Sequence, residues 1–134
     1  VVAAVGLAQE PAAGPDPAQH YSRIADRGEA RGRLYLATVR AARAVGAPSP
    51  DLVFADLWGQ PDRDAYERSA VQAAAPGARI LATRPRLGQL GAAHGLTDVA
   101  LATALIQRGD ATCALVTASG AAGDLGAAVV WGRP

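Results

Sequence analysis

The chain has no lysine and no methionine, and one cysteine, Cys113, among its 134 residues. Without lysine it offers no amine for Schiff-base chemistry and no lysine to hold a phosphate. A single cysteine excludes an internal disulfide and fits a reducing compartment, so we expect a cytoplasmic protein. Aromatic residues make up only 4% of the chain, while the apolar share is 50%. We therefore expect elements that pack closely through small side chains.

The charge is nearly balanced, because thirteen basic residues, all of them arginine, face twelve acidic ones. A net charge of +1 predicts neither a nucleic-acid partner nor an anionic membrane surface. No apolar run reaches membrane-spanning length. The length is that of one domain, residues 1–134, or of part of a larger one.

Apolar runs and turn residues alternate along the chain and predict five strands and three helices. The predicted strands are residues 1–8, 52–55, 79–83, 112–117 and 127–131. The predicted helices are residues 29–45, 62–75 and a third that begins at 92 or 96 and ends at 107. The loops are 9–17, 84–91 and 118–126. The order βαβαβαββ predicts an α/β fold with one five-stranded, mostly parallel sheet closed by a hairpin-like pair. In the first helix, the predicted buried face is Leu34, Ala37, Ala41 and Val45.

The segment 96–106 is apolar around almost its whole circumference, with Asp98 as its one strongly polar member. A helix of this kind should be covered on all sides. One sheet covers a single side, so the pattern predicts a further layer, which another chain could supply. The simpler interpretation is a central helix of a small domain.

The strand at residues 52–55 ends in an acid, Asp56, followed by a turn and more acids. A buried strand of this kind delivers a side chain to a site at its carboxyl end. Active ketosynthases have a strand that ends in His-Gly-Thr-Gly-Thr-Pro, then a Gly-Asp pair, then a Glu. Gly59, Pro61, Asp64 and Glu67 keep this register. Asp56 stands where the first catalytic histidine would be.

Two further blocks follow in the same order. The second in such enzymes is a Lys, then Gly-His, then small residues before a buried helix. The residues that keep its register are Gly88, Leu90, Ala92, Ala93 and Gly95. Arg84 replaces the lysine and Gln89 replaces the second catalytic histidine. The third block, residues 119–123, keeps two glycines of a Gly-rich turn but neither of its phenylalanines.

Together the three blocks resemble the C-terminal half of the thiolase-like fold of β-ketoacyl synthases. They resemble most closely the chain length factors, the non-condensing partners of type II polyketide ketosynthases. The resemblance implies a five-layered αβαβα assembly that a partner chain completes, either a ketosynthase or a separate N-terminal half. It implies a subunit of an acyltransferase complex that shapes the acyl tunnel, lacks catalytic residues itself, and meets an acyl carrier protein with its phosphopantetheine. It implies no metal and no cofactor bound directly.

The replaced residues cannot support condensation. Decarboxylative condensation needs a cysteine nucleophile and two neutral imidazoles that stabilise a thioester enolate. Asp56 is anionic near neutral pH and would repel the enolate, and Gln89 cannot act as an acid or base. Cys113 lies inside a predicted strand, as an inert apolar residue would, and the family's nucleophile belongs to the N-terminal half.

The remaining polar candidates receive structural interpretations. We expect His94 to be a surface or interface histidine, and His20 to lie in a loop without a partner visible in the sequence. The segment 84–86, which carries two arginines and has Arg79 nearby, fits either a solvated loop, which we favour, or a contact with an acidic carrier protein or a phosphopantetheine phosphate. Trp58 is predicted to be a packing or interface residue.

An alternative resemblance is to the phosphoacceptor strand of a response-regulator receiver, carried by residues 50–57. Active receivers need an acidic pair after the first strand and a late lysine. Here Glu10 stands alone and the chain has no lysine. The alternative is therefore a degenerate receiver that acts as a signalling interaction module. A parallel sheet covered by helices on both faces would favour it.

Overall fold

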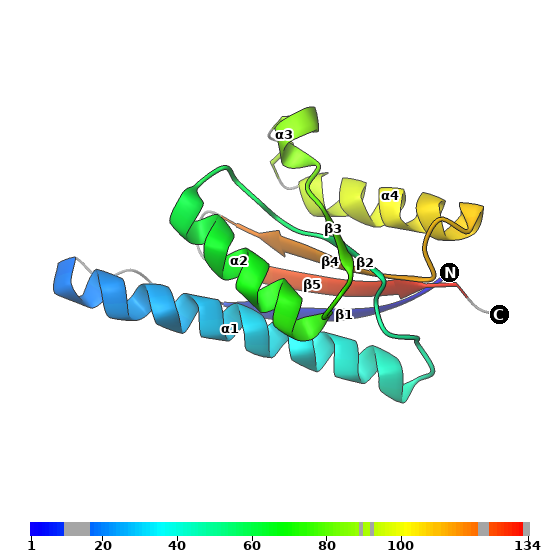
Figure 1. The fold of residues 1–134 in the computed structure, drawn as a ribbon, viewed down its shortest axis with the longest axis horizontal. Coiled ribbons are helices and arrows are strands. Elements are labelled where there is room, and N and C mark those ends of the chain that lie inside the picture. The colour runs from blue at the N-terminus through cyan, green and yellow to red at the C-terminus, as the bar shows by residue number, and fades with distance from the viewer. Residues whose placement is uncertain (10–16, 89, 92, 121–123, 133–134) are drawn as a thin grey trace.

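Strands and helices alternate along the chain, as the apolar pattern predicts (Figure 1). The computed structural model describes residues 1–9, 17–88, 90–91, 93–120 and 124–132. The elements are β1 (Val2–Gln9), α1 (Pro17–Ala44), β2 (Leu52–Phe54), α2 (Pro61–Ala74), β3 (Arg79–Leu81), α3 (Arg84–Leu87), α4 (Ala93–Arg108), β4 (Cys113–Ser119) and β5 (Asp124–Trp131). No helix in these ranges combines the length and the apolar character needed to cross a membrane.

The five strands form one mixed sheet in the order β1-β5-β4-β2-β3. β2 is parallel to both β3 and β4, and β5 is antiparallel to both β4 and β1. The β4–β5 pair confirms the predicted hairpin-like closure. The prediction of a mostly parallel sheet is wrong in that β1 joins the far edge antiparallel to β5, because an apolar pattern does not encode which strand a distant strand pairs with.

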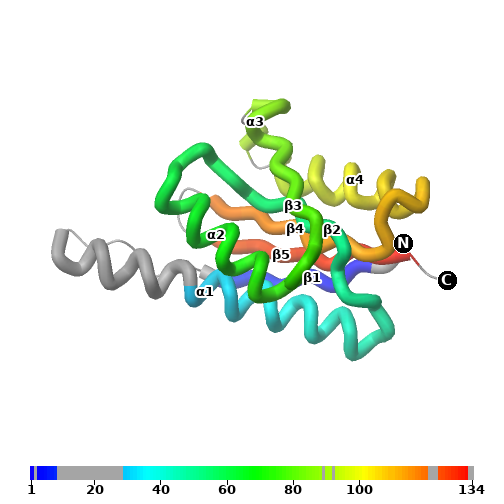
Figure 2. The backbone as a smooth tube through the Cα atoms, in the orientation of Figure 1, coloured from blue at the N-terminus to red at the C-terminus, as the bar shows by residue number. Residues whose placement is uncertain are grey.

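Helices cover the two faces of the sheet unequally (Figures 1 and 2). α1 and α2 lie on one face, where Val53, Leu115 and Val129 join their apolar side chains in the core. α4 lies on the other face, over a smaller cluster that includes Phe54 and Val130. The alternation of side chains along each strand supplies both cores.

α1 begins at Pro17, earlier than the predicted helix. Proline suits the first turn of a helix, because the amide it lacks would be unpaired there anyway. The predicted buried face of this helix is wrong for Ala37, Ala41 and Val45, which are exposed, whereas Leu34 is partly buried and packs against the core. The buried face is rotated and comprises Arg31, Tyr35, Thr38, Val39 and Ala42. Tyr35 and Arg31 turn inward because both bind a buried carboxylate on α2.

α4 buries one stripe against the sheet, made of His94, Asp98, Ala102 and Ile106. Its outer side stays open, with Leu96 74% exposed and Leu101 39% exposed. The composition of this helix predicts that it is covered on all sides, but this chain covers only the side that faces the sheet. The segment predicted as a loop at 84–91 instead begins with the single turn α3, whose first turn contains Pro85.

Candidate functional site

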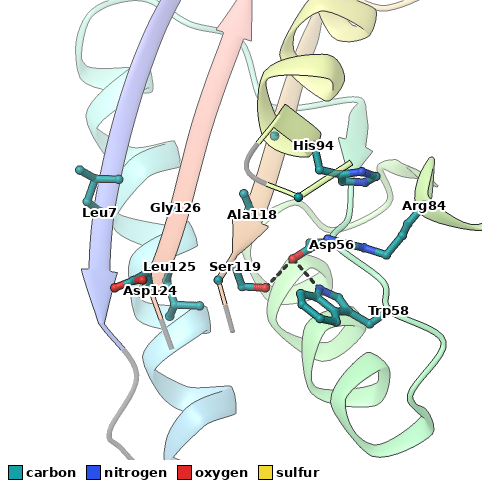
Figure 3. Close-up of a pocket in the computed structure, with 13 residues that line it drawn as sticks. Leu7, Asp56, Trp58, Arg84, His94, Ala118, Ser119, Asp124, Leu125 and Gly126 are labelled. Atoms are coloured by element: carbon teal, nitrogen blue, oxygen red, sulfur yellow. Dashed lines mark hydrogen bonds and ion pairs between the residues drawn. The ribbon is translucent and has the colours of Figure 1, made fainter. Parts of the chain in front are cut away.

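A cavity of about 450 Å³ lies at the carboxyl ends of β2 and β4 (Figure 3). Parallel neighbouring strands bring their carboxyl ends to the same edge, where side chains from separate segments meet. The lining residues come from β1, the turn after β2, α3, the segment before α4 and the start of that helix, and the β4–β5 hairpin. They are Leu7, Asp56, Trp58, Arg84, Gly91, His94, Gly95, Ala118, Ser119, Gly120, Asp124, Leu125 and Gly126.

Asp56 is the polar centre of this wall, and it is 1% exposed. Its Oδ2 accepts hydrogen bonds from the Trp58 Nε1–H, at 2.9 Å, and from the Ser119 hydroxyl (Figure 3). Its Oδ1 accepts a hydrogen bond from a guanidinium nitrogen of Arg84. A guanidinium nitrogen of Arg63 lies 3.7 Å from Oδ2. The carboxylate is thus held by two cations and two neutral donors.

These contacts determine the ionisation of Asp56. Burial alone would raise the pKa of this carboxyl, but the hydrogen bonds from Ser119, Trp58 and Arg84 outweigh it and lower the pKa below its ordinary value. Asp56 is consequently a carboxylate at neutral pH. It accepts hydrogen bonds and has no proton to donate.

Trp58 is a platform for the two cations. The guanidinium carbons of Arg63 and Arg84 lie 4.0 Å and 4.3 Å from the centre of its ring. Stacking of this kind adds attraction to the ion pairs. The prediction of a packing role for Trp58 is consistent with this arrangement, in which the ring positions both arginines beside Asp56.

The turn after β2 is held by Asp64 at the start of α2. Its two carboxylate oxygens accept hydrogen bonds from the backbone amides of Trp58, at 2.8 Å, and Gly59, at 2.9 Å. Gly59 has a φ of 77°, a conformation that favours glycine. Both residues keep the register of the ketosynthase motif, and here their role is to shape the turn that delivers Asp56.

Glu67, the last residue of that motif, lies fully buried under the other face of the sheet. It accepts hydrogen bonds from Arg31 and Tyr35, each at 2.9 Å, and from the Thr117 hydroxyl. Thr117 also accepts a hydrogen bond from the backbone amide of Asp56, at 3.0 Å. A continuous polar network therefore connects the site to α1 and α2 through the sheet.

His94 is a buried residue of the cavity wall, so the expectation of a surface histidine is wrong. The other expectation, an interface histidine, stays a prediction. His94 is 4% exposed, and its Nε2 lies 3.0 Å from the Thr83 hydroxyl. The same hydroxyl donates to Asp98 Oδ1 at 2.6 Å. Burial raises the pKa of Asp98, and the hydrogen bond from Thr83 only partly offsets that effect. The signal in the sequence was the spacing of His94 and Asp98, four residues apart on one side of a helix.

Of the residues predicted for the site, the structure brings Asp56 and Arg84 together. Arg84 is 11% exposed at its side chain, so the expectation of a solvated segment is wrong for this residue, while its neighbours Pro85 and Arg86 are exposed, on the helical turn α3 and not on a loop. Gln89 and His20 lie outside the residues whose side chains the structure describes. Cys113 is fully buried at the first position of β4, and Ser119, beside Asp56, is at the last.

Sequence reasoning missed Arg63, Ser119 and the network around Glu67. Buried side chains on α2 follow Glu67 at Ala70, Val71 and Ala74, a helical spacing that would have indicated a buried carboxylate. Ser119 and Arg63 gave no comparable signal. In the described parts of the chain, no group of His, Cys, Asp and Glu side chains could hold a metal ion.

No family model matches this chain, and no curated protein matches it. Among solved structures it is similar to the Streptomyces albus JA3453 oxazolomycin ketosynthase domain OzmH KS8, with a TM-score of 0.72 and 16% sequence identity. The match covers 97% of this chain and 44% of that chain, so this chain spans less than half the length of its structural neighbour. At this identity the likeness concerns the fold: the five-stranded α/β arrangement matches a part of a thiolase-like ketosynthase.

The receiver alternative is not supported. The structural neighbour is a ketosynthase domain, and β5 runs antiparallel to both of its neighbours. The single parallel sheet that would have favoured a receiver is therefore not the arrangement found.

Proposed function

We propose that this chain is a non-catalytic, chain-length-factor-like part of a β-ketoacyl synthase complex, which leaves decarboxylative condensation to a partner. The observation that carries the proposal is the ionised, buried Asp56 carboxylate beside Arg84, where the motif of active enzymes has an imidazole. Condensation requires a neutral donor that points at a developing enolate oxygen. A carboxylate has no such proton and repels the negative charge, so this position cannot serve the reaction.

The nucleophile needed for acyl transfer is also missing from the cavity. Cys113 is the only cysteine of the chain and lies at the other end of β4 from Ser119. Burial, with a smaller effect from Asp51, raises the pKa of the Cys113 thiol to about 12. A thiol of that kind is not a thiolate at neutral pH and is unreactive.

An uncovered apolar surface supports a partner chain. Leu96 on α4 is 74% exposed, and Val5 and Leu7 on β1 are 70% and 81% exposed. Val5 pairs with Ala128, which packs in the α4 cluster, and Leu7 lines the cavity with the start of α4. These side chains therefore share one side of the sheet. Contiguous exposed apolar surface commonly marks an interface. We propose an obligate hetero-oligomer, with a ketosynthase or a separate N-terminal half chain on this surface.

The same proposal includes an acyl carrier protein. Arg86 on α3 and Arg79 on β3 are exposed, and both are free of the contacts that hold Arg84 in the cavity wall. Exposed arginines suit an acidic protein surface or the phosphate of a phosphopantetheine arm. The carrier would deliver its acyl group to the partner, and this chain would contribute part of the tunnel wall.

The test compares the chain alone with the complex it forms. Native mass spectrometry of the purified complex identifies the partner, and malonyl-carrier-protein decarboxylation measures the chemistry. We expect activity and the acyl group on the partner alone. The isolated double variant Asp56→His, Gln89→His should remain inactive, because the nucleophile is elsewhere. Condensation by the isolated chain would refute the proposal, and a stable soluble monomer would refute its obligate partner.

A further inference from the structure

The two edges of the sheet differ in how they are protected against pairing with another strand. β3, at one edge, has three residues and carries the exposed Arg79. β1, at the other edge, has eight residues and contains neither a charged residue nor a proline. Natural proteins keep an unpaired edge short, charged or interrupted by a bulge, because its free backbone groups otherwise pair with another chain. β3 is short and charged, and β1 is neither.

The outer side of β1 offers backbone groups to a further strand. All of β1 pairs with β5 in an unbroken register, without a bulge. In such a strand every second residue directs its N–H and C=O away from the neighbour it pairs with. Figure 3 shows β1, which carries Leu7, outside β5. In the described parts of the chain, no strand and no backbone hydrogen bond reaches the outer side of β1. An extended strand is the partner that satisfies such groups.

The side chains of β1 are covered on one face only. On the face toward α1 the strand is small: Ala4 packs against the core, and a Cβ on Gly6 would lie 2.3 Å from the hydroxyl oxygen of Thr38. On the opposite face Val5 is 70% exposed and Leu7 is 81% exposed. A strand added at this edge would therefore also cover apolar surface that this chain leaves open.

The sequence of β1 suits pairing with a second copy of itself. The segment Val2–Ala8 is uncharged and apolar throughout, and its midpoint is Val5. Two antiparallel copies centred there place Val5 opposite Val5 and Leu7 opposite Ala3, so no charge is buried and each leucine faces a small residue. A pair of β-branched residues at the centre stabilises antiparallel strands. We propose that two copies of this chain pair antiparallel through β1, with Val5 on the twofold axis, and join their sheets into one.

This pairing does not depend on the proposed function. The ketosynthase or N-terminal half proposed above covers the face of the sheet that includes Leu96 on α4, whereas the second copy binds the backbone at the edge. If both contacts form, the complex contains two copies of this chain and two of its partner.

Disulfide crosslinking tests the pairing on the purified protein, with any chain that copurifies. Opposite residues of antiparallel strands have Cα atoms about 4.5–5.5 Å apart, a distance that a disulfide spans. Val5→Cys should therefore crosslink two copies under mild oxidation, and Cys113 adds little background because it is fully buried. Val45→Cys is the matched control, since Val45 is also 70% exposed and lies just past the end of α1. We expect Val5→Cys to crosslink about tenfold faster or more, because a paired copy has a higher effective concentration than one met by collision.

A second pair of variants tests the position of the axis. Leu7→Cys and Ala3→Cys should each crosslink slowly alone, since neither residue lies opposite itself. A mixture of the two proteins, allowed to exchange subunits, should form the mixed disulfide. Faster crosslinking of Leu7→Cys alone than of Val5→Cys would overturn the assigned axis.

The number of copies tests the pairing without a crosslink. Native mass spectrometry should find two copies of this chain in the wild-type complex and in Val45→Lys. Val5→Lys should leave one copy, because it places like charges directly opposite each other. One copy in the wild type, equal crosslinking of Val5→Cys and Val45→Cys, or a disulfide from Val5→Cys to a different protein would overturn the proposal. Loss of the hetero-partner in Leu96→Arg with two copies retained would show that the two contacts are separate.

Discussion

Arg31 and Glu67 form a buried ion pair between α1 and α2, with Nη1 of Arg31 2.9 Å from Oε2 of Glu67. The two side chains are 3% and 0% exposed. Tyr35 and Thr117 complete the hydrogen bonding of the same carboxylate. Thr117 also accepts a hydrogen bond from the backbone amide of Asp56. The Arg31–Glu67 pair therefore stabilises the residues that position Asp56 in the candidate site.

Replacing Arg31 with methionine should destabilise the fold severely. Glu67 would lose its cation while remaining buried, which costs about 3–5 kcal/mol for a broken buried pair. Arg33→Met is the matched control, since Arg33 pairs with Glu29 at a similar distance of 2.8 Å on the exposed side of α1. The control should cost about 0.3–0.5 kcal/mol. Urea unfolding measures the free energy of unfolding of both variants. Equal decreases would show that burial does not determine how much each ion pair contributes to stability.

Replacing each of two glycines with alanine should change the stability of the protein in opposite directions. A Cβ at Gly6 would lie 2.3 Å from the Thr38 hydroxyl oxygen and 3.0 Å from Leu34, so Gly6→Ala should loosen β1 from α1 and cost about 1–3 kcal/mol. Gly32, within α1, has open space at the same position. Gly32→Ala should stabilise the protein by about 0.5–1 kcal/mol, because alanine is the better helix former. Thermal unfolding checks the two signs, and stabilisation by Gly6→Ala would contradict the close packing of β1 on α1.

Asp56 should make the protein acid-sensitive. Its pKa is lower in the folded protein than in the unfolded chain, so its contribution to stability is complete above the unfolded value of about 3.9 and is lost as the pH falls through the folded value. The stability difference between the wild type and Asp56→Asn should therefore shrink as the pH falls below about 4. Unfolding midpoints at pH 3 and pH 6 measure it, with the exposed Asp62→Asn as control. A difference that widens in acid would contradict the direction of the shift.

The thiol of Cys113 should report on unfolding. Its burial and its pKa of about 12 predict almost no reaction with iodoacetamide in the native protein at pH 7.5. Reaction should become complete under denaturing conditions. Mass spectrometry after labelling with and without urea gives the result. Rapid native labelling would show that the start of β4 opens readily.

The uncovered side of α4 should be sensitive to charge in the proposed complex. Leu96→Arg places a cation on the apolar surface and should weaken partner binding by about tenfold or more, since burying an unpaired charge costs several kcal/mol. Gln72→Arg, on α2 at the opposite face of the sheet, should leave binding unchanged. Unfolding temperatures should stay close to that of the wild type in both variants. Equal binding by all three proteins would exclude this surface as the interface.

Local patterns predicted most elements, and pairing information was the part they lacked. The strand at Leu52–Phe54 and the helix at Pro61–Ala74 lie within a residue or two of their predictions, because an apolar run and a proline define them locally. The direction of β1 depends on a partner more than a hundred residues away, and no local pattern reports it.

The sequence predicted those site residues that belong to a recognisable motif near the end of a strand. Asp56 and Arg84 were identified through their register in such motifs, and the structure joins them. The spacing of His94 and Asp98 places both on one side of a helix, but the burial of His94 also depends on Thr83 and on the shape of the cavity, which the sequence does not report. Arg63 reaches Asp56 only through the geometry of the turn that Asp64 holds.

The pairing of the first strand with the last has a consequence for synthesis. Val2 lies opposite Trp131, so β1 cannot pair with β5 until residues 124–131 have left the ribosome. Closing so long a loop is slow, and contacts of this range delay folding. Until then the apolar strand is unpaired, and exposed apolar strands of this kind are prone to aggregation.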